Sequence, residues 1–355
     1  MFKLKSNLFK NFLLVSMIMV ISGCSISFGG GKGGNDGGVY VSANNGNTWQ
    51  QKNLIPTTSG GPKSISAINV NVLVMDPSDP KALYYGSIDN GLFYTYNNTS
   101  EWHSVSGLAK ATINDLAVDP NSKCIIYAAM GNKVYKSTDC NRTWTQIYFD
   151  NDTSVQVRTI VVDHYDSASL YIGTSRGEII KSINRGVSWQ TIVRFDDNII
   201  RLFISPHDSR LMFAATAKKG IFRSSDNGIN WVSLKDNLAD FKNSSDFRDM
   251  VLSPAEPDLI FLATKYGLLK SVDNGNNWTT IELITPEAKA TINAIAISPK
   301  NVKEIYYVTN TTFYRSNDGG ENWSTKKLPT TRAGWKLLIN PEETSIIYMG
   351  VKGLK

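Results

Sequence analysis

The sequence predicts an all-β fold, a seven-bladed β-propeller of four-stranded antiparallel blades. Two observations predict it. An octet that ends in tryptophan recurs seven times, and its tryptophans lie 53, 42, 45, 42, 47 and 45 residues apart. Each period also contains the same series of short apolar strands separated by turn residues. A fixed period of roughly 40–50 residues with four short strands per repeat is typical of propeller blades.

The seven octets share a pattern of residue types. Serine or threonine stands first, aspartate or asparagine third and glycine usually fifth; the octets end at Trp49, Trp102, Trp144, Trp189, Trp231, Trp278 and Trp323. The aspartates of the pattern are Asp139, Asp226, Asp273 and Asp318. The copies depart from it at Asn44, Asn97 and Asn184, which replace aspartate, and at Thr99 and Asn141, which replace glycine.

We interpret the octet as a structural fastener of each blade. Its carboxylate or amide can accept backbone N–H bonds within the turn, and its glycine supplies a positive φ. Its tryptophan can bury about 200 Å² against the blade. Asparagine could keep such hydrogen bonds but could not act as a catalytic acid, so its presence in three copies favours the structural interpretation.

Each period is predicted to contain four strands in a constant order. Residues 114–120 exemplify the first strand and its turn, 169–174 the second, 220–224 the third, which enters the octet, and 145–149 the fourth. The strands are apolar at consecutive positions because a blade packs against a neighbour on each face.

Six whole repeats begin near residues 68, 113, 157, 199, 247 and 292. The C-terminal segment supplies two strands and the start of a third, and the N-terminal segment from residue 38 supplies the missing third and fourth. Both ends are therefore expected to share one blade, which closes the ring and removes open sheet edges.

The N-terminus is predicted to be a lipoprotein signal peptide over residues 1–23. Three lysines precede an apolar run at 12–22, which is shorter than a spanning helix of about 20 residues. Ile21-Ser22-Gly23-Cys24 resembles a bacterial lipobox, so Cys24 is expected to carry a lipid; an ordinary signal peptide is the alternative. Residues 24–37 are glycine-rich and predict a flexible tether to the propeller of residues 38–355.

These features predict an exported protein anchored to a membrane by its lipid. Ser25 gives no signal for retention at the inner membrane, so the outer membrane or the cell surface is the preferred destination. The apolar content of 41% and charged content of 19% suit one folded domain. The formal charge of +6 falls to about +3 without the three lysines of the leader, which argues against nucleic-acid binding.

The two remaining cysteines are predicted to form a disulfide. Residues 124–140 form a hairpin pattern with a turn at Gly131-Asn132. Pairing Ala129 with Val134 across this turn places Cys124 beside Cys140, and an exported chain can oxidise them. Two free thiols are the alternative.

The face of the ring opposite the octets carries the loops that enter the first strands and the turns between strands two and three. Aligning the repeats on their proline-containing turns places seven residues at the mouth of the channel on this face: Asn71, Asp115, Arg158, Arg201, Arg248, Asn293 and Trp335. Four bases of the turns between strands two and three lie near them: Arg176, Lys218, Lys219 and Lys265.

This basic group is a candidate docking patch for an acidic partner; scattered solvated bases are the alternative. Arg158, Arg201 and Arg248 come from the starts of three consecutive innermost strands. Trp335, outside the octets, is either an aromatic platform at the mouth or packing between blades. The long loops 52–66 and 235–247 are equally consistent with binding loops and with tolerated insertions.

The octet pattern S-x-D-x-G-x-x-W resembles the Asp-box or BNR repeat, and the resemblance covers residues 38–355. Sialidases, xyloglucanase-type glycosidases, the sortilin ectodomain and photosystem II assembly/stability-factor-like lipoproteins carry this repeat, and similar bacterial chains are described as WD/YVTN/BNR-like propellers. The resemblance implies either a non-catalytic scaffold or assembly factor of the cell envelope, or a surface protein that binds or hydrolyses glycans.

The residues favour the non-catalytic interpretation. The sialidase family implies a propeller of six blades, and xyloglucanase-type glycosidases use two propellers with facing carboxylates. This sequence instead predicts one propeller of seven blades. Asp115 and Asp249 are the only carboxylate pair that can be nominated at the mouth, and His103, His164 and His207 form neither a triad nor a metal site in the predicted strands. We therefore expect a monomer without cofactor or metal that binds an envelope protein, with glycan binding or hydrolysis as the alternative.

Overall fold

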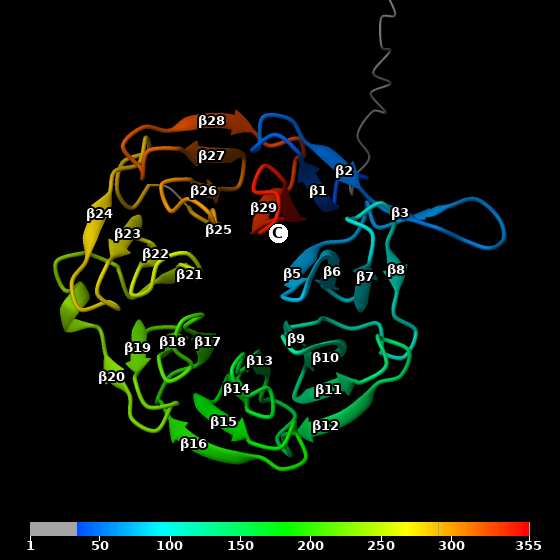
Figure 1. Ribbon diagram of the computed structural model, residues 1–355, viewed down its shortest axis with the longest axis horizontal. Helices are drawn as coiled ribbons and strands as arrows, with labels where there is room; N and C mark the ends of the chain where they lie inside the picture. The colour runs from blue at the N-terminus through cyan, green and yellow to red at the C-terminus, as the bar shows by residue number, and fades with distance from the viewer. Residues whose placement is uncertain (1–33, 290, 355) are drawn as a thin grey trace, which may run out of the picture. The chain divides into compact units, whose positions relative to one another are not determined.

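The computed structural model describes residues 34–289 and 291–354, so the predicted signal peptide and Cys24 lie outside the described residues. The described residues form thirty β-strands and one short 3-10 helix. Seven four-stranded antiparallel sheets follow one another around a central channel (Figure 1). The predicted all-β seven-bladed propeller is confirmed.

Six blades run through the chain in order, each from its innermost to its outermost strand. They are β5 (Val70–Asp76), β6 (Asp79–Ser87), β7 (Leu92–Thr95) and β8 (His103–Ser104); β9 (Asp115–Asp119), β10 (Ser122–Met130), β11 (Lys133–Ser137) and β12 (Thr145–Phe149); β13 (Val157–Val162), β14 (Leu170–Thr174), β15 (Glu178–Ser182) and β16 (Gln190–Arg194); β17 (Ile199–Ile204), β18 (Met212–Thr216), β19 (Ile221–Ser224) and β20 (Val232–Ser233); β21 (Phe247–Leu252), β22 (Ile260–Thr264), β23 (Leu268–Ser271) and β24 (Thr279–Ile281); and β25 (Ala294–Ile297), β26 (Ile305–Val308), β27 (Thr312–Ser316) and β28 (Ser324–Lys327).

The two ends of the propeller share the seventh blade, as the sequence predicts. Its strands, from inside to outside, are β29 (Ala333–Ile339), β30 (Ile347–Lys352), β1 (Gly38–Ser42) and β2 (Gln50–Lys52). β1 pairs with β30 in one unbroken register, from Gly38 opposite Val351 to Ser42 opposite Ile347. Pairing the two ends of the propeller in one sheet leaves no open edge at the point of closure.

The propeller also includes the last four residues that the sequence assigned to the tether, 34–37. The N–H of Gly37 donates to the carbonyl of Ser66 at 2.7 Å. The Oδ2 atom of Asp36 accepts from the N–H of Thr331 at 2.7 Å. Asp36 and Gly37 therefore belong to the folded unit, which begins at Gly34.

The octets lie between the third and fourth strands and fold as the structural interpretation requires. The Oγ of Ser224 accepts the N–H of Gly228 at 2.9 Å and donates to Oδ1 of Asp226 at 2.8 Å. The same Oδ1 accepts the N–H of Asn230 at 2.8 Å. Asn227 (φ 59°) and Gly228 (φ 82°) both adopt left-handed backbone, so the turn needs two positive φ angles where the sequence suggested one.

The octet carboxylates are held in their ionised form. Hydrogen bonds from the backbone N–H and side chain of Asn322 lower the pKa of Asp318 to about 2. The side chain and N–H of Thr143 lower the pKa of Asp139 to about 2. A general acid that works near neutral pH needs a raised pKa, so these carboxylates suit turn formation and not proton transfer.

Three of the seven octet tryptophans donate a hydrogen bond to the preceding blade, whereas Trp231 and Trp278 donate to the glycine carbonyl of their own octet, at 2.9 and 3.0 Å. The Nε1 atoms of Trp102, Trp189 and Trp323 donate to backbone carbonyls within or directly after the outermost strand of the preceding blade, at 3.0, 3.0 and 2.8 Å. Trp102 and Trp278 are buried, whereas the other five keep part of their surface exposed. The octets of Trp102, Trp189 and Trp323 therefore hold the preceding blade as well as their own turn.

The hydrophobic core is divided among the contacts between blades. One cluster joins Val72 and Tyr84 of one blade to Leu116 and Ile126 of the next. Burial of both faces explains why the strands are apolar at consecutive positions.

The structure contains the predicted disulfide between Cys124 and Cys140, and Ala129 pairs with Val134 as the hairpin pattern requires. The two long loops have local structure of their own. Loop 52–66 contains the hairpin β3 (Leu54–Ile55) and β4 (Lys63–Ser64), and loop 235–247 contains the 3-10 helix η1 (Asp236–Leu238).

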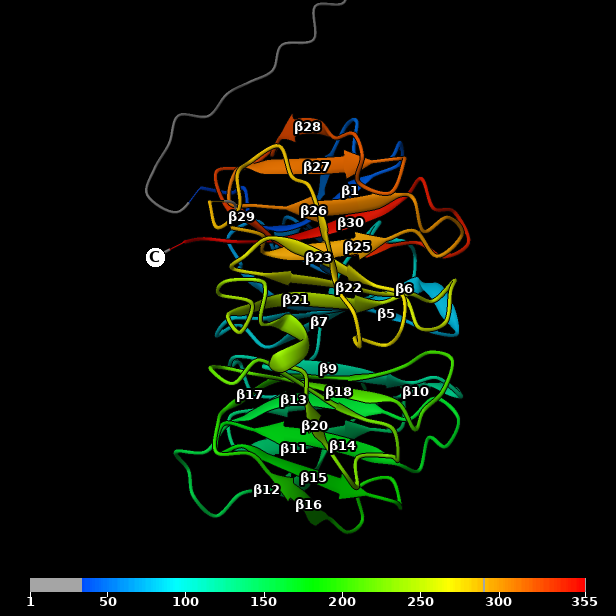
Figure 2. The ribbon, with the colours of Figure 1, turned by 90° about the vertical axis from the view of Figure 1, so that its left-hand side faces the viewer.

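The antiparallel order of the strands gives the propeller two distinct faces. Octets and the turns between strands one and two lie on one face, which we call the octet face. The loops that enter β5, β9, β13, β17, β21, β25 and β29 lie on the other, the mouth face, at which β30 also ends (left in Figure 2). Among the described residues, no helix has the length and apolar character to cross a membrane.

Candidate functional site

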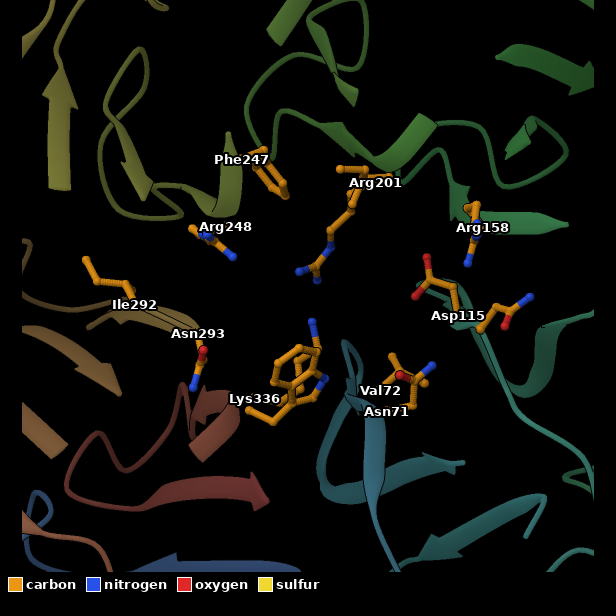
Figure 3. A pocket seen from close by; sticks show the side chains of 13 residues that line it. Asn71, Val72, Asp115, Arg158, Arg201, Phe247, Arg248, Ile292, Asn293 and Lys336 are labelled. Carbon is orange, nitrogen blue, oxygen red and sulfur yellow. The ribbon is translucent and has the colours of Figure 1, made fainter. Parts of the chain in front are cut away.

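A cavity of about 270 Å³ occupies the channel at the mouth face (Figure 3). All seven residues that the sequence alignment placed at the mouth line this cavity: Asn71, Asp115, Arg158, Arg201, Arg248, Asn293 and Trp335. Six further lining residues were not anticipated: Val72, Asn114, Ile200, Phe247, Ile292 and Lys336. We call this group of thirteen residues the mouth cavity.

β-Bulges at the start of the inner strands shape the mouth cavity. The register shifts once at the beginning of β5, β13, β17, β21 and β29, so that two residues face one on the second strand. The extra residues are Asn71, Arg158, Ile200, Arg248 and Trp335, and all five line the cavity. Arg201 therefore does not occupy the position of Arg158 and Arg248, as the sequence alignment assumed, but the next one.

The asparagines of the mouth cavity hold neighbouring blades together. The Nδ2 atoms of Asn71, Asn114 and Asn293 donate to the carbonyls of Ile113, Val157 and Gly334 in the next blade, at 2.8, 2.8 and 2.9 Å. Through their Nδ2 atoms these amides position the inner strands.

The carboxylates at the mouth make similar contacts between blades. Asp115 accepts the N–H groups of Leu116 and Ile160, each at 3.0 Å. Asp249 is buried; its Oδ2 accepts the N–H of Ile295 at 3.0 Å, and its Oδ1 accepts Nη1 of Arg201 at 3.0 Å. Both acids are thus bound on each oxygen by groups of the fold.

Cationic groups remain directed into the cavity. The side chain of Arg158 makes no hydrogen bond or ion pair with the described residues. Arg248 makes only a long contact of 3.4 Å with Asp246 on the exposed rim. The side chains of Arg201 and Lys336 point toward each other across the channel, and Arg248 points toward the same space (Figure 3).

Burial and the arrangement of cationic groups change the pKa of Lys336. It is partly buried, and its ammonium group makes no hydrogen bond or ion pair with the described residues. Burial and the neighbouring charge of Arg201 lower its pKa to about 8, although Asp249 and Asp115 act in the opposite direction. The sequence shows only one lysine in an apolar strand, WKLLI, which gives no sign of this environment.

The low pKa of Lys336 predicts a pH-dependent stability. The unfolded chain has a lysine pKa near 10.4, so it binds more protons than the folded chain above about pH 8. The free energy of unfolding should therefore rise by about 1 kcal/mol between pH 7 and pH 9. Urea unfolding of wild type and Lys336→Met measures this: the wild type should show the rise and the variant should not. An equal pH response in both proteins would contradict the assignment.

The outer bases predicted for the patch do not line the cavity. Arg176 pairs with both Asp150 and Glu178 at 2.7 Å, so its charge is compensated. Lys219 lies 3.5 Å from Asp196. Lys218 and Lys265 are likewise absent from the cavity wall. Of the predicted bases, Arg158, Arg201 and Arg248 line the cavity, together with Lys336, which the sequence did not single out.

Trp335 lies in the wall of the mouth cavity and is partly exposed. The Nζ atom of Lys352 sits 3.9 Å from the centre of its ring, a cation–π contact. The Lys352 ammonium on this ring is thus a further positive charge beside the cavity.

A second cavity, of about 580 Å³, occupies the channel toward the octet face. All seven inner strands contribute apolar residues to it, among them Val74, Val251 and Ile339, and prolines of the turns between strands one and two surround its opening. It shares Asp115 and Arg201 with the mouth cavity. The sequence did not predict this second cavity, because the apolar residues that line it were interpreted as packing between blades.

Among residues 34–289 and 291–354, no group of histidine, cysteine, aspartate or glutamate side chains is placed to bind a metal ion. The three histidines lie apart from the mouth cavity. The Nε2 of His207 contacts the carbonyl of Ser253 at 3.0 Å, and His103 lies beside Glu101.

Comparison with known proteins identifies the fold. No protein-family model matches the sequence, and no curated protein sequence matches it significantly. Solved structures do match. A GH74 xyloglucanase from Xanthomonas campestris shares 16% identity with a TM-score of 0.65, over 81% of this chain and 51% of the xyloglucanase. A GH74 enzyme from Niastella koreensis shares 17% identity with a TM-score of 0.64, over 84% of this chain and 53% of the enzyme.

Two YCF48 structures are similar to this chain to the same degree. YCF48 bound to a D1 peptide shares 16% identity with a TM-score of 0.63, over 84% of this chain and 95% of YCF48. YCF48 from Cyanidioschyzon merolae shares 12% identity with a TM-score of 0.61 and is covered over 97% of its length. This chain spans about half the length of the two glycoside hydrolases. At these identities the similarity shows the propeller fold alone, and both types of neighbour share it.

Proposed function

We propose that this protein is a membrane-anchored, non-catalytic propeller that binds an acidic segment of a cell-envelope protein at its mouth cavity. The central observation is that the polar side chains of the mouth fall into two groups with different contacts. Asparagine and aspartate side chains hold the blades together, whereas Arg158, Arg248 and Lys336 are left facing the cavity without a strong partner among the described residues. Charges arranged in this way attract and orient an acidic partner.

Two further observations support the proposal. YCF48, which matches this chain over nearly its whole length, has been solved with a bound peptide. In this chain, the carbonyl of Gly34 accepts Nη2 of Arg332 at 3.0 Å, and Arg332 immediately precedes β29 on the mouth face. If Cys24 carries the lipid, the ten residues from Cys24 to Gly33 span at most about 36 Å, so the mouth would stay near the membrane surface.

Capture from solubilised envelopes tests this proposal. The full chain in detergent serves as bait, with chemical crosslinking to retain weak partners. Arg158→Glu with Arg248→Glu should reduce capture of one envelope protein by at least about tenfold, because two attractive charges become repulsive. Arg201 is left unchanged, since its bond to Asp249 would make its replacement a test of stability.

Lys218→Glu with Lys265→Glu is the matched control, because it makes the same change of charge on the same face outside the cavity. Capture should survive in this control and should weaken with added salt in the wild type. An equal loss of captured protein in both double variants would contradict docking at the mouth cavity. Capture that is unchanged by Arg158→Glu with Arg248→Glu would contradict it as well.

Glycan binding or hydrolysis is the second candidate function, and the GH74 neighbours favour it. We propose that Asp115 and Asp249 would be the carboxylates to test. Asparagine keeps one acceptor oxygen for one of the two groups that each carboxylate binds, but it removes the acid. Turnover of a sialoside or β-glucan that is lost in folded Asp115→Asn or Asp249→Asn would overturn the non-catalytic proposal; absence of turnover by the wild type on these substrates would agree with it.

A further inference from the structure

We propose that the mouth cavity contains a seat for one carboxylate, formed by Arg201 of β17, Arg248 of β21 and Lys336 of β29. The inference deepens the proposed function and rests on it for the identity of the partner, because it names the chemical group through which the mouth would hold an acidic segment. The carboxylate seat itself can be tested with a small molecule. The three cationic side chains come from three inner strands and converge on one space (Figure 3).

Arg201 is held in place as a donor. Its Nη1 bonds to Asp249, which in turn accepts the N–H of Ile295, so one edge of the guanidinium is anchored to two blades. The side chain is 35% exposed, and its remaining N–H groups form no hydrogen bond with the described residues. A guanidinium offers several donors in a fixed plane, which suits a carboxylate.

Lys336 faces Arg201 with no anion between them. Two like charges in a partly buried cavity repel each other more strongly than they would in water. The other charged groups around Lys336 do not resolve this: Asp115 and Asp249 are already bonded to N–H groups of the fold and to Arg201, and Lys352 adds a further positive charge. A bound carboxylate would accept from both cations and relieve their repulsion.

The walls of the cavity indicate what the carboxylate is attached to. Val72, Ile200, Phe247 and Ile292 provide apolar surface around the three cationic groups. A volume of about 270 Å³ accommodates an aliphatic stem with a carboxylate at its end. A glutamate side chain of a docked protein and a free short dicarboxylate share this chemistry.

Binding should be linked to a proton at Lys336. The pKa of about 8 in the free protein leaves a large fraction of the amine neutral at pH 8, and a neighbouring carboxylate would raise this pKa again. Binding at pH 8 is therefore expected to take up about half a proton. The affinity should fall about tenfold from pH 7 to pH 9, in parallel with the protonated fraction of the free protein.

Titration calorimetry on the full chain in detergent tests the carboxylate seat. The probes are glutarate and a glycine–glutamate copolymer peptide, each measured at pH 8 in two buffers of different ionisation enthalpy, which together give the number of protons taken up. Wild type should bind at least one probe with proton uptake. Lys336→Arg should bind without uptake because its charge is permanent, and Lys336→Met should lose about tenfold in affinity. Lys218→Met is the control and should behave as wild type.

The outcomes separate this inference from the proposed function. Binding of glutarate with Lys336-dependent proton uptake supports the seat even if no envelope protein is captured. Binding of the peptide alone, with the same dependence, supports it and assigns the carboxylate to a protein. Peptide binding that is identical in wild type, Lys336→Arg and Lys336→Met would overturn the seat and leave docking at the mouth intact. Failure of folded wild type to bind either probe would also overturn it; circular dichroism and thermal unfolding establish folding for each variant.

Discussion

Replacing Gly320 by alanine is expected to lower the free energy of unfolding by about 3 kcal/mol. Gly320 is the glycine of the seventh octet and has a φ of 99°, which an L-residue adopts at a cost. A Cβ at this position would also overlap the Cγ2 methyl of Ile281, which is buried in the outermost strand of the preceding blade. Strained backbone and overpacking add in this variant.

Gly319, the preceding residue, provides a matched control. Its φ is 83°, but a Cβ would have no atom within 4 Å. Gly319→Ala should therefore lose only about 1 kcal/mol, from backbone strain alone. Urea unfolding of the three proteins measures both effects. Equal losses in the two variants would show that the octet glycine is needed for its φ and not for contact between blades.

Removing the disulfide is expected to lower the free energy of unfolding by about 3 kcal/mol. Cys124 and Cys140 are 16 residues apart, and closing a loop of this length restricts the unfolded chain by about that amount. Cys124→Ser with Cys140→Ser should show the loss in urea unfolding. Treatment of the wild type with a reducing agent should shift its urea unfolding midpoint to that of the double variant. The same treatment should leave the midpoint of the double variant unchanged. A reducing agent that leaves the wild-type midpoint unchanged would contradict a stabilising disulfide.

The sequence predicted the fold well because repetition averages out local ambiguity. A single stretch such as SVDNGNNW could be any turn, but seven copies at a nearly constant spacing fix the blade, its four strands and the closure by both ends. The same alignment brought Asn71, Arg158 and Trp335 to one cavity. Positions that recur in register are predictable because equivalent residues have equivalent neighbours in every blade.

The parts that were missed depend on geometry that a repeat does not encode. A bulge inserts one residue, so Ile200 occupies the position assigned to Arg201, and Arg201 meets Asp249 of the next blade instead. Arg176 was predicted to be a mouth base, but its guanidinium pairs with Asp150 and Glu178. Glu178 lies two residues from Arg176 and Asp150 lies in the loop that enters β13, so these ion pairs depend on side-chain directions that the sequence leaves open.

The functional account depends on the mouth face, and not the octet face, contacting the partner. Site-specific photocrosslinking in living cells tests this most directly. A photoreactive phenylalanine analogue is placed at Ile200, which lines the mouth cavity and is 38% exposed, or at Val272, which is 66% exposed on an octet. The account predicts a discrete adduct with one envelope protein from position 200 and none from position 272. An adduct from position 272 alone would contradict it.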